Sequence, residues 1–225
     1  MIKAVLYDFD GTLADTNDLI VNSWQHVYET LEGEKHPVDE IYATFGEPLR
    51  DSMAAAFPDW DTDEVVDIYR QYQYKIFDGQ IRMCKNAYMM VTMVKAAGIK
   101  SAVVTARLKY TTMRGLKIFG LDDFFDAVVT REDVEKSKPD PESALKALEI
   151  IGAAPEEALM LGDTIHDIRC AHNAGVTAVL ANWGMSSTGK DAEGEDAPDF
   201  VINDPVELIP VIRELSGGEI THIDE

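Results

Sequence analysis

The chain contains little cysteine. Its two cysteines, Cys84 and Cys170, are too few for a disulfide framework and do not have the paired spacing of a metal site. Disulfide crosslinks and zinc–thiolate centres are therefore excluded as the basis of the fold, and the composition favours a reducing compartment. We accordingly expect a cytoplasmic protein.

Positive charge is also scarce, with 20 lysine and arginine residues against 41 aspartate and glutamate residues and a formal net charge of −21. Nucleic acids and acidic membranes are bound through basic side chains that neutralise phosphates, so we expect no nucleic-acid partner and no membrane partner. The sequence also has no apolar run of membrane-spanning length and no leader-like pattern of a basic and then an apolar segment. An anionic substrate needs local positive groups here, because the overall field repels it.

The sequence does have a regular alternation of short apolar runs and helix-length amphipathic segments. Its hydrophobic content of 46% over 225 residues is enough for a large core. The apolar runs are continuous, which is typical of parallel strands covered by helices on both faces. This pattern predicts an α/β fold with a doubly wound parallel sheet. The expected strands are 4–7, 101–105, 126–130, 158–162, 177–181 and 199–202, and the expected helices are 87–97, 110–119, 141–151, 165–174 and 205–215.

One interval breaks this alternation. Between Thr16 and about Asp78 the sequence shows only helical patterns, such as DLIVNSWQHVYETLE and DEVVDIYRQYQYKIF. A helical segment of this length, inserted after the first strand, predicts a separate small domain. We therefore expect a core formed by 1–16 and 80–215, a helical cap at 17–79 and a polar tail at 216–225.

Polar side chains gather at the carboxyl ends of the expected strands. They are Asp8 and Asp10 in DFDGT, Thr105 in VVT, Lys138 in KSKPDPE, and Asp163 and Asp167 in GDTIHD. Ligands of open parallel sheets bind outside these strand ends, so the groups should converge. Clustered carboxylates suit a hard cation such as Mg²⁺, while a hydroxyl and an ammonium suit phosphate oxygens. An ionised aspartate can also attack phosphorus.

Each of these residues has a simpler explanation when taken alone. Two aspartates at i and i+2 often cap a turn, a lone threonine often fills a strand, and acidic residues often begin a helix because of its dipole. Lys138 could be an exposed loop lysine. It is improbable that all these explanations hold together at successive strand ends, so the set favours a site.

A rival motif lies at 184–191, where GMSSTGKD matches a phosphate-binding P-loop except that Asp191 replaces Ser or Thr. The following AEGEDAPD is acidic and predicts no helix, so we interpret the match as chance within an acidic surface loop at 184–198. The histidines carry no comparable pattern. His26 is expected to pack or to face solvent in the cap. His166 could line the edge of the site, but exposure on the surface of its helix is the expectation.

Together the motifs DFDGT, VVT, KSKPDPE and GDTIHD resemble, in order, the four motifs of the haloacid dehalogenase superfamily. The resemblance covers 2–215, and the helical insertion is similar to the smaller helical cap of that superfamily. DTNDLIVNSWQH and FFDAVVTREDVEKSKPDPE most resemble its phosphoglycolate phosphatase branch and bacterial pyrophosphatases of the PpaX type. This resemblance implies a Mg²⁺-dependent phosphatase that forms an aspartyl-phosphate and acts on a small phosphorylated substrate, phosphoglycolate or pyrophosphate.

The resemblance also implies the chemistry at the first strand. Asp8 would attack phosphorus in line, and Asp10 would protonate the leaving oxygen and then activate water. Mg²⁺ would be held by Asp8, the main-chain carbonyl of Asp10 and Asp163, with Asp167 supporting these ligands.

Further implied roles concern the phosphate and the leaving group. Thr105 would donate a hydrogen bond to a phosphate oxygen, and Lys138 would pair with the phosphate and with Asp8. The branch usually reads TNK where this chain reads TAR, so the basic charge is kept while the amide is lost. The remaining candidates for substrate contact are Gly11, Asn17, Gly46, Arg50, Ala106 and Arg107.

Two other functions are compatible with these motifs. One is a phosphotransferase similar to β-phosphoglucomutase, although such mutases usually have DGV where this chain has Gly11 and Thr12, which favours hydrolysis. The other is a non-catalytic binding protein, because a fold alone does not establish chemistry. The presence of every motif residue argues against the second. We expect a monomer or a weak homodimer.

Overall fold

The computed structural model describes residues 1–184 and 192–218. The chain divides into two compact units, which are Met1–Asp15 with Met83–Glu225, here called the core unit, and Thr16–Arg82, called the helical unit. None of the helices in the described ranges is long and apolar enough to cross a membrane. Most of the P-loop-like stretch, 185–191, and most of the expected polar tail, 219–225, lie outside the described residues.

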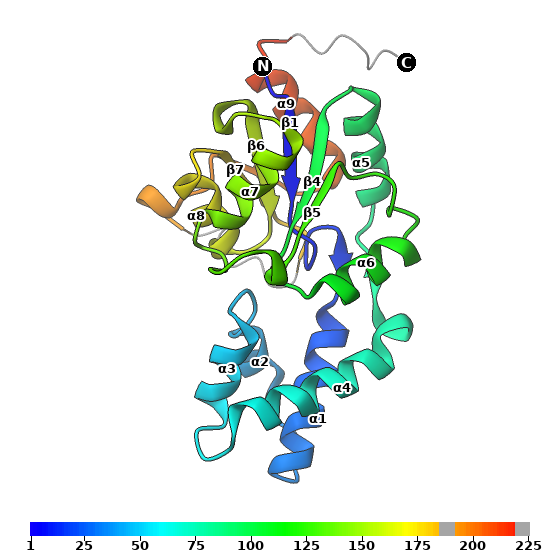
Figure 1. The fold of residues 1–225 in the computed structure, drawn as a ribbon, viewed down its shortest axis with the longest axis vertical. Coiled ribbons are helices and arrows are strands. Elements are labelled where there is room, and N and C mark those ends of the chain that lie inside the picture. Colours follow the sequence, from blue (N-terminus) through cyan, green and yellow to red (C-terminus); the bar gives the residue numbers. More distant parts are fainter. Residues whose placement is uncertain (185–191, 219–225) are drawn as a thin grey trace. The chain divides into compact units, whose positions relative to one another are not determined.

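The core unit contains a six-stranded parallel sheet (Figure 1). Its strands, in the order β5-β4-β1-β6-β7-β8, are β1 (Ala4–Tyr7), β4 (Lys100–Val104), β5 (Ala127–Val129), β6 (Ala158–Gly162), β7 (Thr177–Ala181) and β8 (Phe200–Ile202). Every expected strand is present with shifts of no more than a residue or so at its ends. β1 lies in the interior, with Ala4 opposite Lys100 of β4 and Ala158 of β6. The chain proceeds outward from β1 in both directions, and such a reversal opens a crevice at the carboxyl ends of the strands.

Helices cover both faces of this sheet (Figure 1). They are α5 (Ala87–Ala96), α6 (Lys109–Ile118), α7 (Glu142–Ile151), α8 (Ile165–Asn173) and α9 (Leu208–Leu215). Leu6 and Met160 belong to a buried cluster with apolar residues of α7 and α8. Neighbouring strand residues point to opposite faces, so the equally buried Val5 points to the other face, where α5 and α9 pack against each other. Burial on both faces explains why the apolar runs are continuous.

The helix expected at 205–215 differs at its start. A 3₁₀ turn, Pro205–Glu207, precedes α9, and the side chain of Asp204 accepts a hydrogen bond from the Val206 amide at 3.1 Å. The other helices of the core unit begin and end within one or two residues of the expected positions. α7 ends at Gly152, whose φ of +68° is the left-handed conformation that favours glycine at a helix end.

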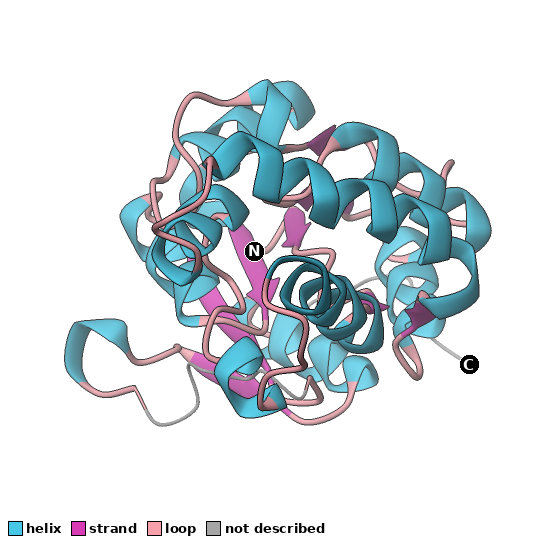
Figure 2. Cartoon of the chain, turned by 90° about the horizontal axis from the view of Figure 1, so that it is seen from below, coloured by secondary structure: helices cyan, strands magenta, loops and turns pink. Residues whose placement is uncertain are grey.

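In the helical unit the regular structure before Arg82 is helical (Figure 2). It consists of α1 (Asn17–Leu31), α2 (Val38–Tyr42), α3 (Leu49–Ala56) and α4 (Thr62–Gln80), as the sequence predicts. These helices bury an apolar cluster of their own around Trp24. The Trp24 ring stacks on that of Phe57 and meets that of Tyr69 edge-on, with centroid distances of 6.4 and 6.3 Å. A separate apolar cluster is what allows such an insertion to fold as its own body.

Two short strands mark the points where the chain leaves and re-enters the core unit. β2 (Ala14–Asp15) pairs with β3 (Arg82–Met83), and the Cys84 amide donates to the Leu13 carbonyl at 3.0 Å. Neither strand was predicted, because two residues are too few to show a hydrophobic period. The exit and return of the chain therefore lie beside the acidic loop that follows β1.

Candidate active site

β1 runs directly into the acidic loop. The Asp8 amide donates to the Leu161 carbonyl of β6 at 2.8 Å, so Asp8 continues the sheet pairing one step beyond the strand. The backbone then turns at Gly11, which has a φ of +72° and donates its amide to the Ala14 carbonyl at 2.8 Å. This turn, which DFDGT predicts, leaves the carboxylate of Asp8 at the strand end and that of Asp10 on the loop.

Lys138 brings a positive charge to the strand ends. Its Nζ lies 2.8 Å from Oδ1 of Asp8 and 2.5 Å from Oδ1 of Asp167. The residue is only 8% exposed, so the explanation as an exposed loop lysine is wrong. Burial lowers the pKa of Lys138, but the carboxylates of Asp167 and Asp8 outweigh this effect and raise the pKa above its usual value. Lys138 therefore supplies a fixed cation in a buried position.

Asp167 is held from two sides. Its Oδ1 accepts from Lys138, and its Oδ2 accepts from the amide and the hydroxyl of Thr164 at 3.0 and 2.7 Å. Thr164 and Asp167 form a capping box at the start of α8. The explanation of Asp167 as an acidic residue at a helix start is thus correct, and the same contacts fix the side chain next to Lys138. This arrangement fits a supporting part in the site.

Asp163 follows β6 and is enclosed by backbone. The residue is 1% exposed, and a Cβ placed on Gly11 would collide with its carboxylate. A Cβ on Gly184 would lie 3.1 Å from Oδ2 of Asp163. Two loops therefore approach this carboxylate closely, so that a side chain at position 11 would collide with it and one at position 184 would be in tight contact.

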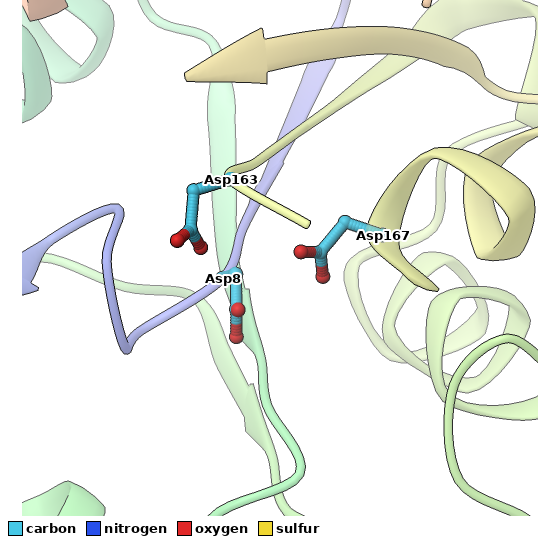
Figure 3. A group of neighbouring side chains, drawn as sticks. All are labelled: Asp8, Asp163 and Asp167. Carbon is cyan, nitrogen blue, oxygen red and sulfur yellow. The ribbon is translucent and has the colours of Figure 1, made fainter. Parts of the chain in front are cut away.

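Three buried carboxylates meet at this point. Asp8, Asp163 and Asp167 each offer an oxygen within 4.8 Å of the others (Figure 3). Burial, followed by the charge of Asp167, raises the pKa of Asp8 to about 7, although the charge of Lys138 lowers it. The raised pKa means that burial and the neighbouring carboxylates together outweigh the effect of Lys138 on Asp8.

The donor set of the site fits a hard divalent cation. With Asp10 the site has four carboxylates, while Lys138 and Arg107 supply two cations, which leaves a surplus of two negative charges. Oxygen donors with such a surplus are what Mg²⁺ prefers. A cation next to Asp8 would also offset the effects of burial and of the Asp167 charge, which raise the pKa of Asp8.

Thr105 and Arg107 lie at the end of β4. The Thr105 amide donates to the Val129 carbonyl of β5 at 3.0 Å, and its hydroxyl oxygen accepts from the Arg107 amide at 3.2 Å. The hydroxyl can therefore donate its own hydrogen to a ligand. The guanidinium of Arg107, expected at the substrate, pairs with Asp10, with Nη2 2.7 Å from Oδ1. Ala106, between these two residues, is exposed.

The remaining candidates for substrate contact belong to the helical unit. Arg50 forms an ion pair with Asp63, and both side chains are well exposed. Gly46 has a φ of +86°, and Asn17 is buried at the start of α1. Their contacts with a substrate remain predictions.

Two residues near the site were not predicted. Thr164 has a signal in the sequence, because a threonine three residues before an acidic residue at a helix start is a capping box. Trp183 has no such signal, since only the fold brings this residue, which follows β7, to the acidic loop. There its Nε1 donates to the Thr12 carbonyl at 3.2 Å.

Of the histidines, His26 stacks on Tyr72, with the two ring centroids 4.0 Å apart. The expectation that His166 faces solvent is wrong, because it is half-buried beside Asp167 in the first turn of α8.

Neither cysteine has the properties of a reactive thiol. Burial raises the pKa of Cys84 to about 12 and that of Cys170 to about 11. A thiolate, which is the nucleophilic form, is therefore disfavoured at both positions. Among the described residues the candidate nucleophile is a carboxylate.

Comparisons with known proteins agree with an enzyme that has a carboxylate site. Residues 5–181 match the family of haloacid dehalogenase-like hydrolases. The chain is 38% identical over 212 residues to pyrophosphatase PpaX of Halalkalibacterium halodurans, with 94% of this chain and 97% of the relative covered. The chain therefore belongs to the haloacid dehalogenase-like hydrolase family, and the predicted resemblance to this family is confirmed.

Solved structures share the same architecture. A putative haloacid dehalogenase-like hydrolase from Bacteroides fragilis matches with a TM-score of 0.80 and 26% identity, over 92% of this chain and 100% of that one. A putative phosphoglycolate phosphatase from Lactobacillus plantarum matches with a TM-score of 0.82 and 22% identity, over 94% of this chain and 99% of that one. At that identity the second match supports the fold alone. The doubly wound α/β fold is thus confirmed.

Proposed function

We propose that this protein is a Mg²⁺-dependent phosphatase that forms an aspartyl-phosphate on Asp8. The observation that carries this proposal is the buried contact at the end of β1, where Lys138 Nζ lies 2.8 Å from Asp8 Oδ1 beside two further carboxylates. A carboxylate at this position can attack phosphorus only if the negative charges of the two partners are offset. Lys138 offsets part of this negative charge, and the acidic cluster would hold the metal cation that offsets the rest.

In the first half of the reaction an oxygen of Asp8 attacks phosphorus. A P–O bond to Asp8 forms while the bond to the leaving oxygen breaks, and Asp10 gives a proton to that oxygen. Lys138 neutralises charge on the transferring phosphoryl group, and the Thr105 hydroxyl donates to one of its oxygens. The position of Asp10 on the turned loop, more exposed than Asp8, suits a group that exchanges protons with substrate and water.

In the second half water attacks the phosphorus of the aspartyl-phosphate. Asp10, now ionised, takes a proton from this water, the bond between phosphorus and Asp8 breaks, and inorganic phosphate leaves. Asp8 returns as a carboxylate paired with Lys138. Each half uses the same two aspartates, so the spacing of two residues in DFD places an attacking group and a proton carrier on one short loop.

Asp8, the main-chain carbonyl of Asp10 and Asp163 would hold Mg²⁺, and Asp167 would support them through Lys138 and Thr164. The ion would offset the charge of the phosphoryl oxygens and of the carboxylate cluster. The surplus of two negative charges and the glycine backbones around Asp163 support this assignment.

For the substrate we propose a small, strongly anionic phosphate, with pyrophosphate ahead of phosphoglycolate. The relative with 38% identity is a pyrophosphatase, which supports this order. Arg50 of the helical unit is our candidate for the second anionic group, because a guanidinium suits phosphate and carboxylate oxygens alike.

The test is kcat/KM for pyrophosphate, phosphoglycolate and β-glucose 1-phosphate at one Mg²⁺ concentration. We expect the highest value for pyrophosphate and loss of all turnover in Asp8→Asn. A higher value for the sugar phosphate, or its isomerisation without release of phosphate, would contradict the proposal.

A further inference from the structure

Arg107 grips Asp10 with two nitrogens. Nε lies 3.1 Å from Oδ1 and 3.0 Å from Oδ2 of Asp10, and Nη2 lies 2.7 Å from Oδ1. Both carboxylate oxygens therefore meet the same edge of the guanidinium. Such a paired contact fixes the plane of a carboxylate as well as its distance, which a single hydrogen bond does not.

Arg107 is itself held firmly. Its side chain is 7% exposed, and its guanidinium carbon lies 5.9 Å from the centre of the Phe9 ring. Its amide donates to the Thr105 hydroxyl at 3.2 Å, and its carbonyl accepts from the Arg131 amide at 3.1 Å. The backbone is thus tied to β4 and to the turn after β5. The guanidinium is thus a fixed group against which the Asp10 side chain is oriented.

The two partners of this pair differ in exposure. Asp10 is 29% exposed in its side chain, four times the value for Arg107. Arg107 therefore holds Asp10 from the protein side and leaves a face of the carboxylate open to ligands and solvent. This is the arrangement expected of a proton-transferring group with a buried support.

We propose that Arg107 is a positioning residue that orients Asp10 for proton transfer to the leaving group. The inference rests on the proposed function, in which Asp10 is the proton carrier. It replaces the expectation that Arg107 contacts the leaving group, because the edge formed by Nε and Nη2 is directed at Asp10. Arg107 acts on the reaction through Asp10.

This role has a signature in the choice of substrate. In an alkyl phosphate such as glycerol 2-phosphate the leaving group is an alcohol, which carries no second anionic group and needs a proton to depart. In p-nitrophenyl phosphate the leaving group departs as the phenolate without a proton. Loss of orientation in Asp10 should therefore slow the alkyl phosphate far more than the aryl phosphate. A direct contact of Arg107 with an anionic leaving group would instead affect pyrophosphate and spare glycerol 2-phosphate.

The experiment measures kcat/KM with glycerol 2-phosphate, p-nitrophenyl phosphate and pyrophosphate for wild type, Arg107→Gln, Asp10→Asn and the double variant. For Arg107→Gln we expect a loss of about 10²-fold on glycerol 2-phosphate, the lower end of the range for general acid catalysis, and of less than about fivefold on p-nitrophenyl phosphate. In the Asp10→Asn background the second substitution should add less than about twofold, because residues that act as one unit are not additive.

Two further variants separate this role from a loss of structure. Arg169→Gln removes a similar two-point pair, with Asp196, on the exposed face of α8, and should leave all three values unchanged. Arg107→Lys keeps the charge but not the planar fork, and should follow the pattern of Arg107→Gln. Thermal unfolding of each variant is measured alongside.

Several results would overturn the proposal. A loss confined to pyrophosphate would make Arg107 a substrate contact, and an equal loss on all substrates that persists in Asp10→Asn would make it structural. A failure of the proposed function is recognised differently, since Asp10→Asn would then retain wild-type kcat/KM on glycerol 2-phosphate.

Discussion

Lys138 Nζ lies 2.8 Å from Oδ1 of Asp8, and both side chains are buried at the carboxyl end of β1. The two residues come from segments far apart in the sequence, and the sheet order brings their loops together. In a buried setting the loss of Lys138 is costly, because Asp8 and Asp167 would both become uncompensated charges. Removal of the lysine should therefore have large and specific consequences.

Lys138→Met should damage both stability and catalysis. The free energy of unfolding should fall by about 3–5 kcal/mol, because Asp8 and Asp167 lose their shared cation. We also expect kcat to fall by roughly 10²–10³-fold. Chemical denaturation and steady-state kinetics measure the two effects.

The matched control is Lys136→Met, two residues earlier, whose side chain is 73% exposed and pairs with Asp140 at 3.5 Å. Its free energy of unfolding should change by no more than about 0.5 kcal/mol. Equal changes in the free energy of unfolding would show that the buried contact with Asp8 contributes no more to stability than the exposed pair.

Asp8→Asn should not destabilise the metal-free protein at pH 8. The folded-state pKa of Asp8 is raised to about 7 from 3.8, so the folded state binds this proton more tightly than the unfolded state. The stabilising effect of that proton is full below about pH 4 and is lost as pH rises through 7. At pH 8 the wild type therefore holds a costly buried charge that the amide lacks, while Lys138 keeps Asp167 at 2.5 Å.

The measurement is thermal unfolding in EDTA between pH 5 and pH 8. We expect the variant to unfold at a higher temperature than the wild type at pH 8, and the advantage to shrink towards pH 5. A variant that is less stable than the wild type by the same margin at every pH would contradict the raised pKa.

Mg²⁺ should bind more tightly as pH rises towards 7. The ion needs the carboxylate form of Asp8, so below this pKa it must displace a proton and its affinity should rise roughly tenfold per pH unit. Above about pH 7 the affinity should level off. Titration calorimetry with Mg²⁺ alone checks this, and Asp8→Asn should show weak binding without the slope. Equal affinity at pH 5.5 and pH 8 would contradict the placement of the ion beside Asp8.

Gly11→Ala should weaken the metal site. A methyl group at this position meets the carboxylate of Asp163, and φ is +72°. We expect a loss of metal affinity and activity on the order of 10–100-fold, as for other residues that support metal ligands. Gly152→Ala is the control, since φ there is +68° but nothing lies within 4 Å of the added carbon. It shares the backbone strain and should keep full activity, so equal losses would exclude the collision as the cause.

Much of the core unit could be predicted because its strands are buried on both faces. Continuous apolar runs located every strand of the large sheet, and the polar residues after β1, β4 and β6 converge because parallel strands share one carboxyl edge. The short β2 and β3 strands could not be found, since their pairing depends on the return of the chain from the helical unit. The 3₁₀ turn at Pro205 could not be predicted, because proline is compatible with the start of a 3₁₀ helix and of an α-helix.

The partners of the site residues were harder to predict than their positions. The resemblance implied the pairing of Lys138 with Asp8 but did not indicate that Asp167 pairs with the same ammonium. Arg107 was expected at the substrate, and its pairing with Asp10 joins residues 97 positions apart. Which carboxylate a buried cation selects depends on side-chain geometry, and a pattern of residue types does not contain it.

The central claim is that Asp8 carries the phosphoryl group, and one measurement tests it most directly. Asp10→Asn, which lacks the proton carrier for hydrolysis, is mixed with ³²P-labelled pyrophosphate and Mg²⁺, quenched in acid within seconds and digested, and the label is mapped by peptide. We predict label on the peptide that contains Asp8, sensitive to hydroxylamine and absent when Asp8 is also replaced by Asn. Label on another residue would contradict the account. So would turnover by the wild type when neither the wild type nor Asp10→Asn carries protein-bound phosphate.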